Sequence, residues 1–181
     1  MRVGGPPWKR MKLMRLLLLV ALTAVSAGAA PPAGDDPWLS RLVGHWVLEG
    51  RIAGKETTHD VDAEWVLNHL YVRLHEVSRE KDSSGKAAYE AIVYVTWHAA
   101  AGEYSVLWLD STASGGFAPE GTGHAKPAGE SLPFVFKDAQ GEISFKNTFA
   151  YDPASGTWSW IMDNVNRGVS KPFGRVTLTR R

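Results

Sequence analysis

From Trp46 to the C-terminus, apolar and polar residues alternate with a period of two over many short segments. The clearest case is residues 143–151, where Ile143, Phe145, Asn147, Phe149 and Tyr151 share one parity. Such alternation is typical of β-strands that bury one face. No long helical period competes with it, so we expect an all-β fold.

Turn signals separate these segments at a spacing of roughly 8–12 residues, which is typical of sandwiches and barrels. One example is the Asp-Pro-Ala-Ser-Gly run at 152–156. Because the turns join neighbouring strands, we predict an antiparallel up-and-down barrel of about nine or ten strands rather than a Greek-key sandwich. The expected strands are residues 45–52, 57–67, 71–79, 88–97, 104–110, 132–138, 143–151, 158–163 and 173–179, with a weak strand around 116–124 and a polar loop at 164–172.

A short helix is expected just before the first strand. Asp36 can cap it, and Pro37 suits its first turn. Its buried side would consist of Trp38, Leu39 and Leu42. Gly44 can take the positive φ that ends a helix. Trp46 then offers a large indole that could plug the floor of a barrel.

The first thirty residues have the layout of a secretory signal peptide. Basic residues between Lys9 and Arg15 precede an apolar run at 16–25, and Ala27-Gly28-Ala29 resembles a cleavage site. A membrane anchor is the alternative, but about ten apolar residues are fewer than the roughly 20 that a membrane span needs. We therefore expect a signal peptide at 1–30 cleaved near Ala29, a linker at 31–36 and a single barrel domain at 37–181. Translation could also start at Met11.

The charge and the cysteine content limit the function classes. Without the five basic residues of the leader, the chain has 15 basic and 19 acidic residues, a net charge of −4. Binding nucleic acid through a broad basic face is therefore not expected. The chain has no cysteine, so it cannot form disulfides or carry a lipid on a cysteine. These features fit a periplasmic or secreted protein with no membrane span in its mature form.

Several short motifs resemble a group of bacterial lipocalin-like barrels of uncharacterised function. The motifs are Gly44-x-Trp46, Trp65-Val66-Leu67-Asn68, Tyr89-Glu90, Tyr104-x-x-x-Trp108-x-Asp110-Ser111 and Thr179-Arg180. The resemblance covers the chain from about Trp38 onward. It implies a calycin-type barrel with a central cavity, and it implies no particular activity.

A more distant likeness is to the nitrobindin-type barrels, which bind haem through an axial histidine on a late strand. The last histidine here is His124, and no later residue can supply that ligand, so haem is not expected. The other histidines are His45, His59, His69, His75 and His98. None belongs to a His-Glu-x-x-His or Cys-His pattern, so scattered surface or rim histidines are favoured over a metal site. We expect no metal and no cofactor.

The aromatic residues have two interpretations. They could fill a closed barrel as core, which is the default for any one of them. They could also line a cavity, because a barrel of nine or ten strands is hard to fill with side chains alone. We predict that the ligand-binding residues are Trp65, Arg73, His75, Tyr94, Trp108, Asp110 and Trp160. Every inward assignment depends on strand register, since a slip of one residue inverts it.

In this hypothesis the tryptophans form walls, and Arg73 and Asp110 orient a polar end of the ligand. The alternative for Asp110 is that it caps the following turn together with Ser111. The preferred function is the binding of a small hydrophobic or amphipathic molecule. Two other functions remain open: a hydrolase or isomerase that uses Asp110 and a histidine, and an envelope interaction protein with a filled interior. No nucleophile elbow or other catalytic motif is present.

Overall fold

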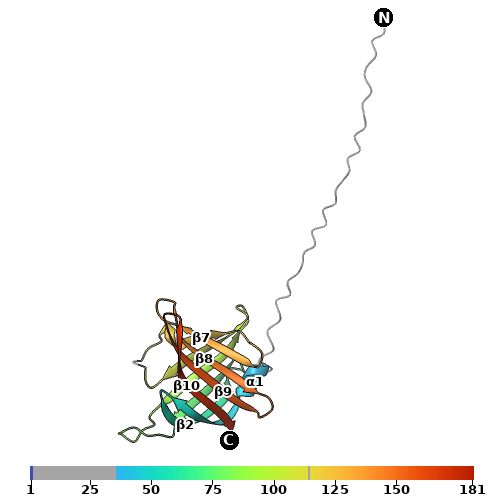
Figure 1. The fold of residues 1–181 in the computed structure, drawn as a ribbon. Coiled ribbons are helices and arrows are strands. Elements are labelled where there is room, and N and C mark those ends of the chain that lie inside the picture. Colours follow the sequence, from blue (N-terminus) through green and yellow to red (C-terminus); the bar gives the residue numbers. More distant parts are fainter. Residues whose placement is uncertain (2–35, 114) are drawn as a thin grey trace.

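The computed structural model describes Met1 and residues 36–113 and 115–181. Residues 2–30 of the expected signal peptide and residues 31–35 of the expected linker lie outside this part of the chain. The described residues form a closed antiparallel barrel of ten strands with one short α-helix (Figure 1). The predicted all-β, up-and-down fold is confirmed.

The elements follow one another around the barrel in chain order. They are α1 (Pro37–Leu42), β1 (Gly44–Ile52), β2 (Lys55–Val66), β3 (Tyr71–Ser78), β4 (Glu90–His98), β5 (Glu103–Asp110), the 3-10 turn η1 (Pro119–Gly121), β6 (Thr122–Ala125), β7 (Ser131–Lys137), β8 (Ile143–Asp152), β9 (Thr157–Asn166) and β10 (Val169–Arg180). Each strand pairs with the next, and β10 returns to pair with β1. This last pairing runs from Trp46 opposite Arg180 to Ile52 opposite Gly174, so seven residue pairs close the sheet.

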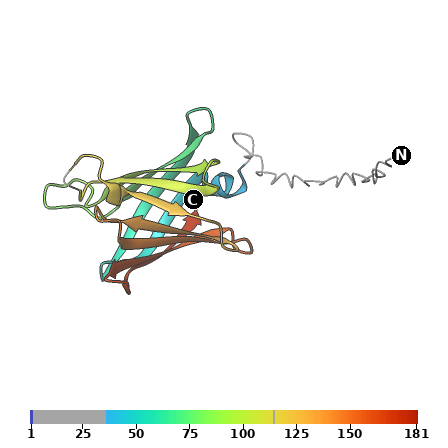
Figure 2. The same ribbon diagram turned by 90° about the horizontal axis from the view of Figure 1, so that it is seen from above.

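The helix α1 covers one end of the barrel (Figure 2). Asp36 caps it, as predicted, by accepting hydrogen bonds at 2.9 Å from the backbone N–H groups of Trp38 and Leu39. The other carboxylate oxygen of Asp36 accepts a hydrogen bond at 2.7 Å from the buried Tyr104 hydroxyl on β5. This one side chain therefore both starts the helix and fastens it to the barrel wall.

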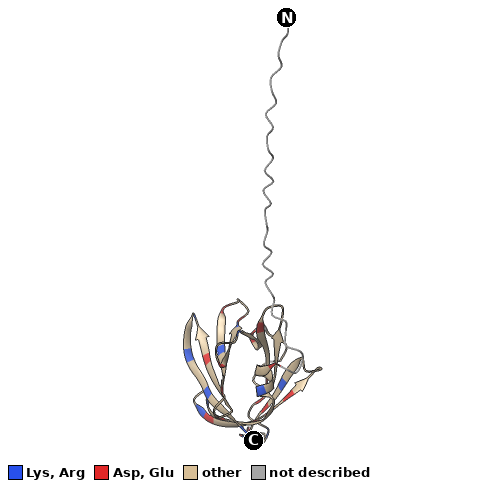
Figure 3. Ribbon diagram, turned by 90° about the vertical axis from the view of Figure 1, so that its right-hand side faces the viewer, with Lys and Arg blue, Asp and Glu red and all other residues tan. Residues whose placement is uncertain are grey.

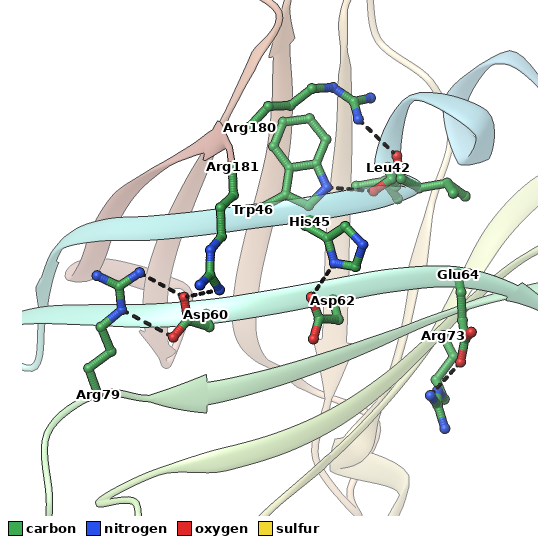
Figure 4. A network of polar contacts seen from close by, with 11 residues as sticks. Leu42, His45, Trp46, Asp60, Asp62, Glu64, Arg73, Arg79, Arg180 and Arg181 are labelled. Carbon is green, nitrogen blue, oxygen red and sulfur yellow. Dashed lines mark hydrogen bonds and ion pairs between the residues drawn. The ribbon is translucent and has the colours of Figure 1, made fainter.

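The buried side chain of Trp46 fills the same end of the barrel, next to the helix. Its indole Nε1 donates a hydrogen bond of 2.8 Å to the carbonyl of Leu42, the last residue of α1. The guanidinium of Arg180 lies 4.4 Å from the centre of the indole ring (Figure 4). Gly44 begins β1 with a φ of 141°, which residues with a side chain rarely adopt, and an added Cβ would meet Arg180 at 2.4 Å.

The outer wall of β1, β2 and β3 carries ion pairs (Figure 4). Asp60 binds Arg79 of the β3–β4 connection at 2.7 Å and Arg181 at 3.4 Å. The hydrogen bond from Arg79 lowers the pKa of Asp60 from its usual value. Along the strands, basic and acidic residues are spread over the wall rather than gathered on one side (Figure 3). The described residues include no helix of the length and hydropathy that crossing a membrane requires.

One loop expected from the sequence is instead part of the sheet. Residues 164–172 were expected to be a polar loop, but they extend the β9–β10 hairpin, and Asn166 lies opposite Val169. Arg167 and Gly168, with φ values of 50° and 77°, form the two-residue turn. Positive φ at both positions matches the twist of antiparallel strands, which explains how polar residues continue the ladder.

We predict that Trp46→Phe lowers the free energy of unfolding by about 1 kcal/mol more than Trp160→Phe does. Both indoles are 1% exposed, so both variants lose a similar volume, but only the Trp46 N–H has a hydrogen-bond partner. Urea unfolding followed by circular dichroism measures the difference. Equal losses in the two variants would show that the bond to Leu42 does not help hold α1 on the barrel.

Candidate functional site

A cavity of about 1470 Å³ occupies the barrel at the end opposite α1. The cavity wall includes the ends of strands and residues of the connections at 79–89, 111–113 and 115–121, which lie at this end (Figure 2). Its apolar lining includes Ile52, Tyr89, Trp108, Leu109, Phe117, Phe136, Phe145, Trp160, Met162 and Phe173. Concave, largely apolar spaces of this kind are the usual form of small-molecule sites, which typically measure about 300–1000 Å³.

Some inward positions in the half of the barrel that holds the cavity are occupied by small residues. Near α1 the inward positions of β1 hold Trp46 and Leu48, both almost fully buried. Further along the same face, β1 has Gly50, β3 has Ser78 and β10 has Gly174. Ser78 lines the cavity, whereas the two glycines are closely packed, because an added Cβ would meet the Arg175 carbonyl oxygen at Gly50 and the Met162 side chain at Gly174.

Two polar side chains, His59 of β2 and Glu76 of β3, line the cavity on neighbouring strands. They are 4% and 2% exposed, respectively. The imidazole Nδ1 lies 2.5 Å from Glu76 Oε1, which makes an ion pair when the ring is protonated. The second oxygen, Glu76 Oε2, is buried and has no hydrogen-bond partner among the described residues. Buried polar atoms are rarely left unpaired, so this oxygen needs an explanation.

A line of polar groups runs from this pair toward the mouth of the cavity. His59 Nε2 lies 2.7 Å from Thr57 Oγ1, and that hydroxyl donates to Glu80 Oε2 at 3.1 Å. Burial would raise the pKa of Glu80, but hydrogen bonds from Ser78, Thr58 and Thr57 outweigh it and lower the pKa to about 2. The buried carboxyl of Glu76 is thus connected through one imidazole and one hydroxyl to an ionised carboxylate at the surface.

Aromatic rings connect His59 with the opposite wall. Tyr89 stacks on the imidazole at 5.5 Å and accepts a hydrogen bond of 2.9 Å from Trp108 Nε1. Burial raises the pKa of the Tyr89 hydroxyl, with the charge of Glu76 as a further cause. Trp108 meets Trp160 edge to face at 5.9 Å, and Trp160 stacks on Phe149 at 4.5 Å. These ring contacts and the Trp108–Tyr89 hydrogen bond hold the orientations of Tyr89, Trp108 and Trp160 in the cavity wall.

Two further buried polar atoms in the cavity lining have no partner among the described residues: Asn147 Oδ1 on β8 and Trp160 Nε1 on β9. Asn147 is 1% exposed and lies between Phe145 and Phe149 on the inward face of its strand. Together with Glu76 Oε2, they give one cavity two unpaired acceptors and one unpaired donor. Each such atom costs roughly 1–3 kcal/mol when it stays unsatisfied.

Three of the seven residues predicted from the sequence line this cavity: Trp108, Asp110 and Trp160. Asp110 lies near the mouth, where one of its oxygens accepts hydrogen bonds from the backbone N–H of Thr112 at 2.8 Å and from its hydroxyl at 2.5 Å. The turn-capping role considered for Asp110 is therefore present alongside its place in the lining.

The other four predicted residues are not among the described residues that line the cavity. Trp65 packs edge to face against His69, 5.6 Å away, near the end of β2. Arg73 and His75 lie on the outer face of β3, paired with Glu64 and with Glu90, the latter at 2.8 Å. Tyr94 is half-buried on β4 opposite Arg73. The structure therefore does not bring Arg73 or His75 to Asp110.

The sequence interpretation missed His59, Glu76 and Asn147, although a signal for them exists. Each occupies a position that shares parity with buried apolar residues of its strand. His59 precedes Val61 and Ala63 on β2, and Glu76 follows Val72 and Leu74 on β3. Asn147 lies between Phe145 and Phe149 on β8. A polar residue at an apolar position of an alternating strand is either paired inside or available to a ligand. Among the described residues, no three His, Asp or Glu side chains are placed to hold a metal ion.

Comparisons with known proteins do not assign this site. No protein-family model matches the chain, and no curated protein sequence does. The fold and the geometry of the cavity therefore carry the functional argument.

We predict that His59→Phe lowers the free energy of unfolding by about 3 kcal/mol or more, because it leaves the buried Glu76 carboxyl without a partner. The double variant His59→Phe/Glu76→Met should recover most of that loss, since no buried ionisable group remains there. Urea unfolding measures both.

The matched control is His75→Phe, which breaks the histidine–glutamate pair with Glu90 on the outer wall. Exposed pairs of this kind contribute about 0–1 kcal/mol. Equal losses for His59→Phe and His75→Phe, or a double variant no more stable than His59→Phe, would contradict the assignment of a buried, coupled pair.

Proposed function

We propose that this chain is a calycin-type β-barrel that binds a small hydrophobic or amphipathic molecule in its cavity. One observation carries the proposal. The residues that line an apolar, aromatic cavity include Glu76, Asn147 and Trp160, whose buried atoms Oε2, Oδ1 and Nε1 have no partner within the described residues. Ligand sites combine apolar walls with a few such oriented polar groups.

The energetic cost of these unpaired polar atoms favours a role in ligand binding over a role in stabilising the fold. A core evolved only for stability would contain apolar residues at these positions, because unsatisfied polar atoms destabilise the folded chain. A ligand that supplies the missing hydrogen bonds would offset the cost of these polar atoms. In this proposal Trp108 and Trp160 form the walls, Glu76 and Asn147 orient the inner end of the ligand, and Asp110 lies at the mouth.

A neutral fluorescent probe tests the proposal. N-phenyl-1-naphthylamine emits strongly only in apolar surroundings, so we expect its emission to rise on binding at one site per chain. Ala88→Trp, at an exposed position in the cavity lining, should weaken binding at least about fivefold by obstructing the mouth. The control is Ala100→Trp, in the exposed β4–β5 turn at the α1 end, which should bind as the unmodified chain does.

Emission that stays flat at micromolar protein, or binding that Ala88→Trp and Ala100→Trp weaken equally, would exclude the cavity as the binding site. The third function considered from the sequence, an interaction protein with a filled interior, predicts the flat response.

One observation favours a second candidate, a hydrolase. Glu76, His59 and Thr57 present a carboxylate, an imidazole and a hydroxyl in the order used for general-base activation of a nucleophile. The hydroxyl of Thr57, however, also hydrogen-bonds to Glu80, which competes for its proton. We therefore place this candidate second to ligand binding.

Short p-nitrophenyl esters separate the two candidates. Ligand binding alone predicts hydrolysis no faster than in buffer. Turnover that Thr57→Val abolishes and Thr58→Val leaves intact would instead establish the hydrolase, because Thr58 is the neighbouring threonine of opposite parity on β2 and does not line the cavity.

A further inference from the structure

The charges around the cavity are mostly negative. The acidic residues in its lining are Glu56, Glu76, Glu80, Asp110 and Glu120. Among the described residues, the lysines and arginines in the lining are Lys55 and Lys81, and both are exposed at the mouth. A negatively charged ligand would therefore meet repulsion as it moves inward, and His59, the basic residue at the buried end of the described lining, is already paired with Glu76.

The buried end of the cavity offers mainly acceptors. Within the described lining, Glu76 Oε2 and Asn147 Oδ1 are unpaired acceptors and Trp160 Nε1 is an unpaired donor. His59 does not satisfy Glu76 Oε2, because its two ring nitrogens already contact Glu76 Oε1 and Thr57 Oγ1. A ligand group that completes this arrangement must bring N–H or O–H donors.

The rings beside these acceptors favour a cation over a neutral donor. Tyr89, Trp108 and Trp160 line the cavity together with Glu76. The faces of aromatic rings attract positive charge, and the attraction is stronger away from water. A charge-assisted hydrogen bond to a buried carboxylate is also about twice as strong as a neutral one.

We infer that the ligand is an apolar amine whose protonated nitrogen is held at the buried end of the cavity by Glu76 Oε2, with Asn147 Oδ1 as a second acceptor and the apolar part against the aromatic walls. This inference rests on the proposed function and names the chemical class of its ligand. Fatty acids, the carboxylate counterparts, are the class that the site disfavours.

Three probes with the same ten-carbon chain test the inference at pH 8, where the amine is cationic and the acid is anionic. Decylamine, decanol and decanoate are titrated into the purified chain by calorimetry and by displacement of N-phenyl-1-naphthylamine. We expect decylamine to bind at least about tenfold more tightly than decanol, and decanoate to bind most weakly. This ranking needs no variant, so it tests the inference even if substitutions in the cavity impair folding.

Glu76→Gln tests the residue that we assign. It should weaken the binding of decylamine at least about tenfold more than the binding of decanol, and so remove the preference for decylamine. Glu90→Gln makes the same substitution in the exposed pair with His75 and should leave the preference intact. A preference that both variants reduce equally would come from the overall surface charge and would overturn the assignment to Glu76.

The outcomes separate this inference from the proposed function. If all three probes bind equally, or if decanoate binds best, the cavity binds apolar molecules and the amine class is wrong. If none of the three binds and the naphthylamine probe also fails, both proposals fall together.

Discussion

The pairing of β1 with β10 is the interaction on which the rest of the structure depends. It joins the first and last strands over seven residue pairs and removes both edges of the sheet. Once the sheet is closed, every second residue of each strand must point into a common interior. The chain has no cysteine, so the hydrogen bonds of this closure and the burial of inward side chains hold the barrel together.

The two ends of the closed barrel differ in how their interior is filled. At one end, α1 and Trp46 fill the interior, and the Asp36–Tyr104 and Trp46–Leu42 hydrogen bonds hold the helix in place. At the other end, a cavity of about 1470 Å³ remains, with Ser78 among its lining residues. Of the five buried polar atoms that lack a partner among the described residues, three belong to residues that line this cavity, and the other two, Arg73 Nε and Trp97 Nε1, do not. The α1 end of the barrel can therefore stabilise the fold, while the cavity end contains polar groups that could bind a ligand.

Period-two alternation was enough to predict a barrel of about nine or ten strands, because most strands have one clearly apolar face, and Asp36 with Pro37 predicted the short helix. The site was harder to predict, and β3 shows why. Its residues Arg73 and His75 look functional, yet they belong to the outer series, whereas Glu76 shares parity with Val72 and Leu74. His59 and Asn147 likewise occupy inward positions in strands whose other inward residues are mostly apolar. Which polar atoms lack a partner depends on contacts across neighbouring strands, and these follow only from the register.

The measurement that tests the central claim most directly is a crystal structure of the purified chain in which ordered non-protein atoms can be seen. We expect such atoms in the cavity, within hydrogen-bond distance of Glu76 Oε2 and Asn147 Oδ1. A cavity filled instead by the chain's own side chains would contradict the claim. The clearest contradiction would be Phe117, here 84% exposed in the connection after β5, folded inward against Trp108 and Trp160.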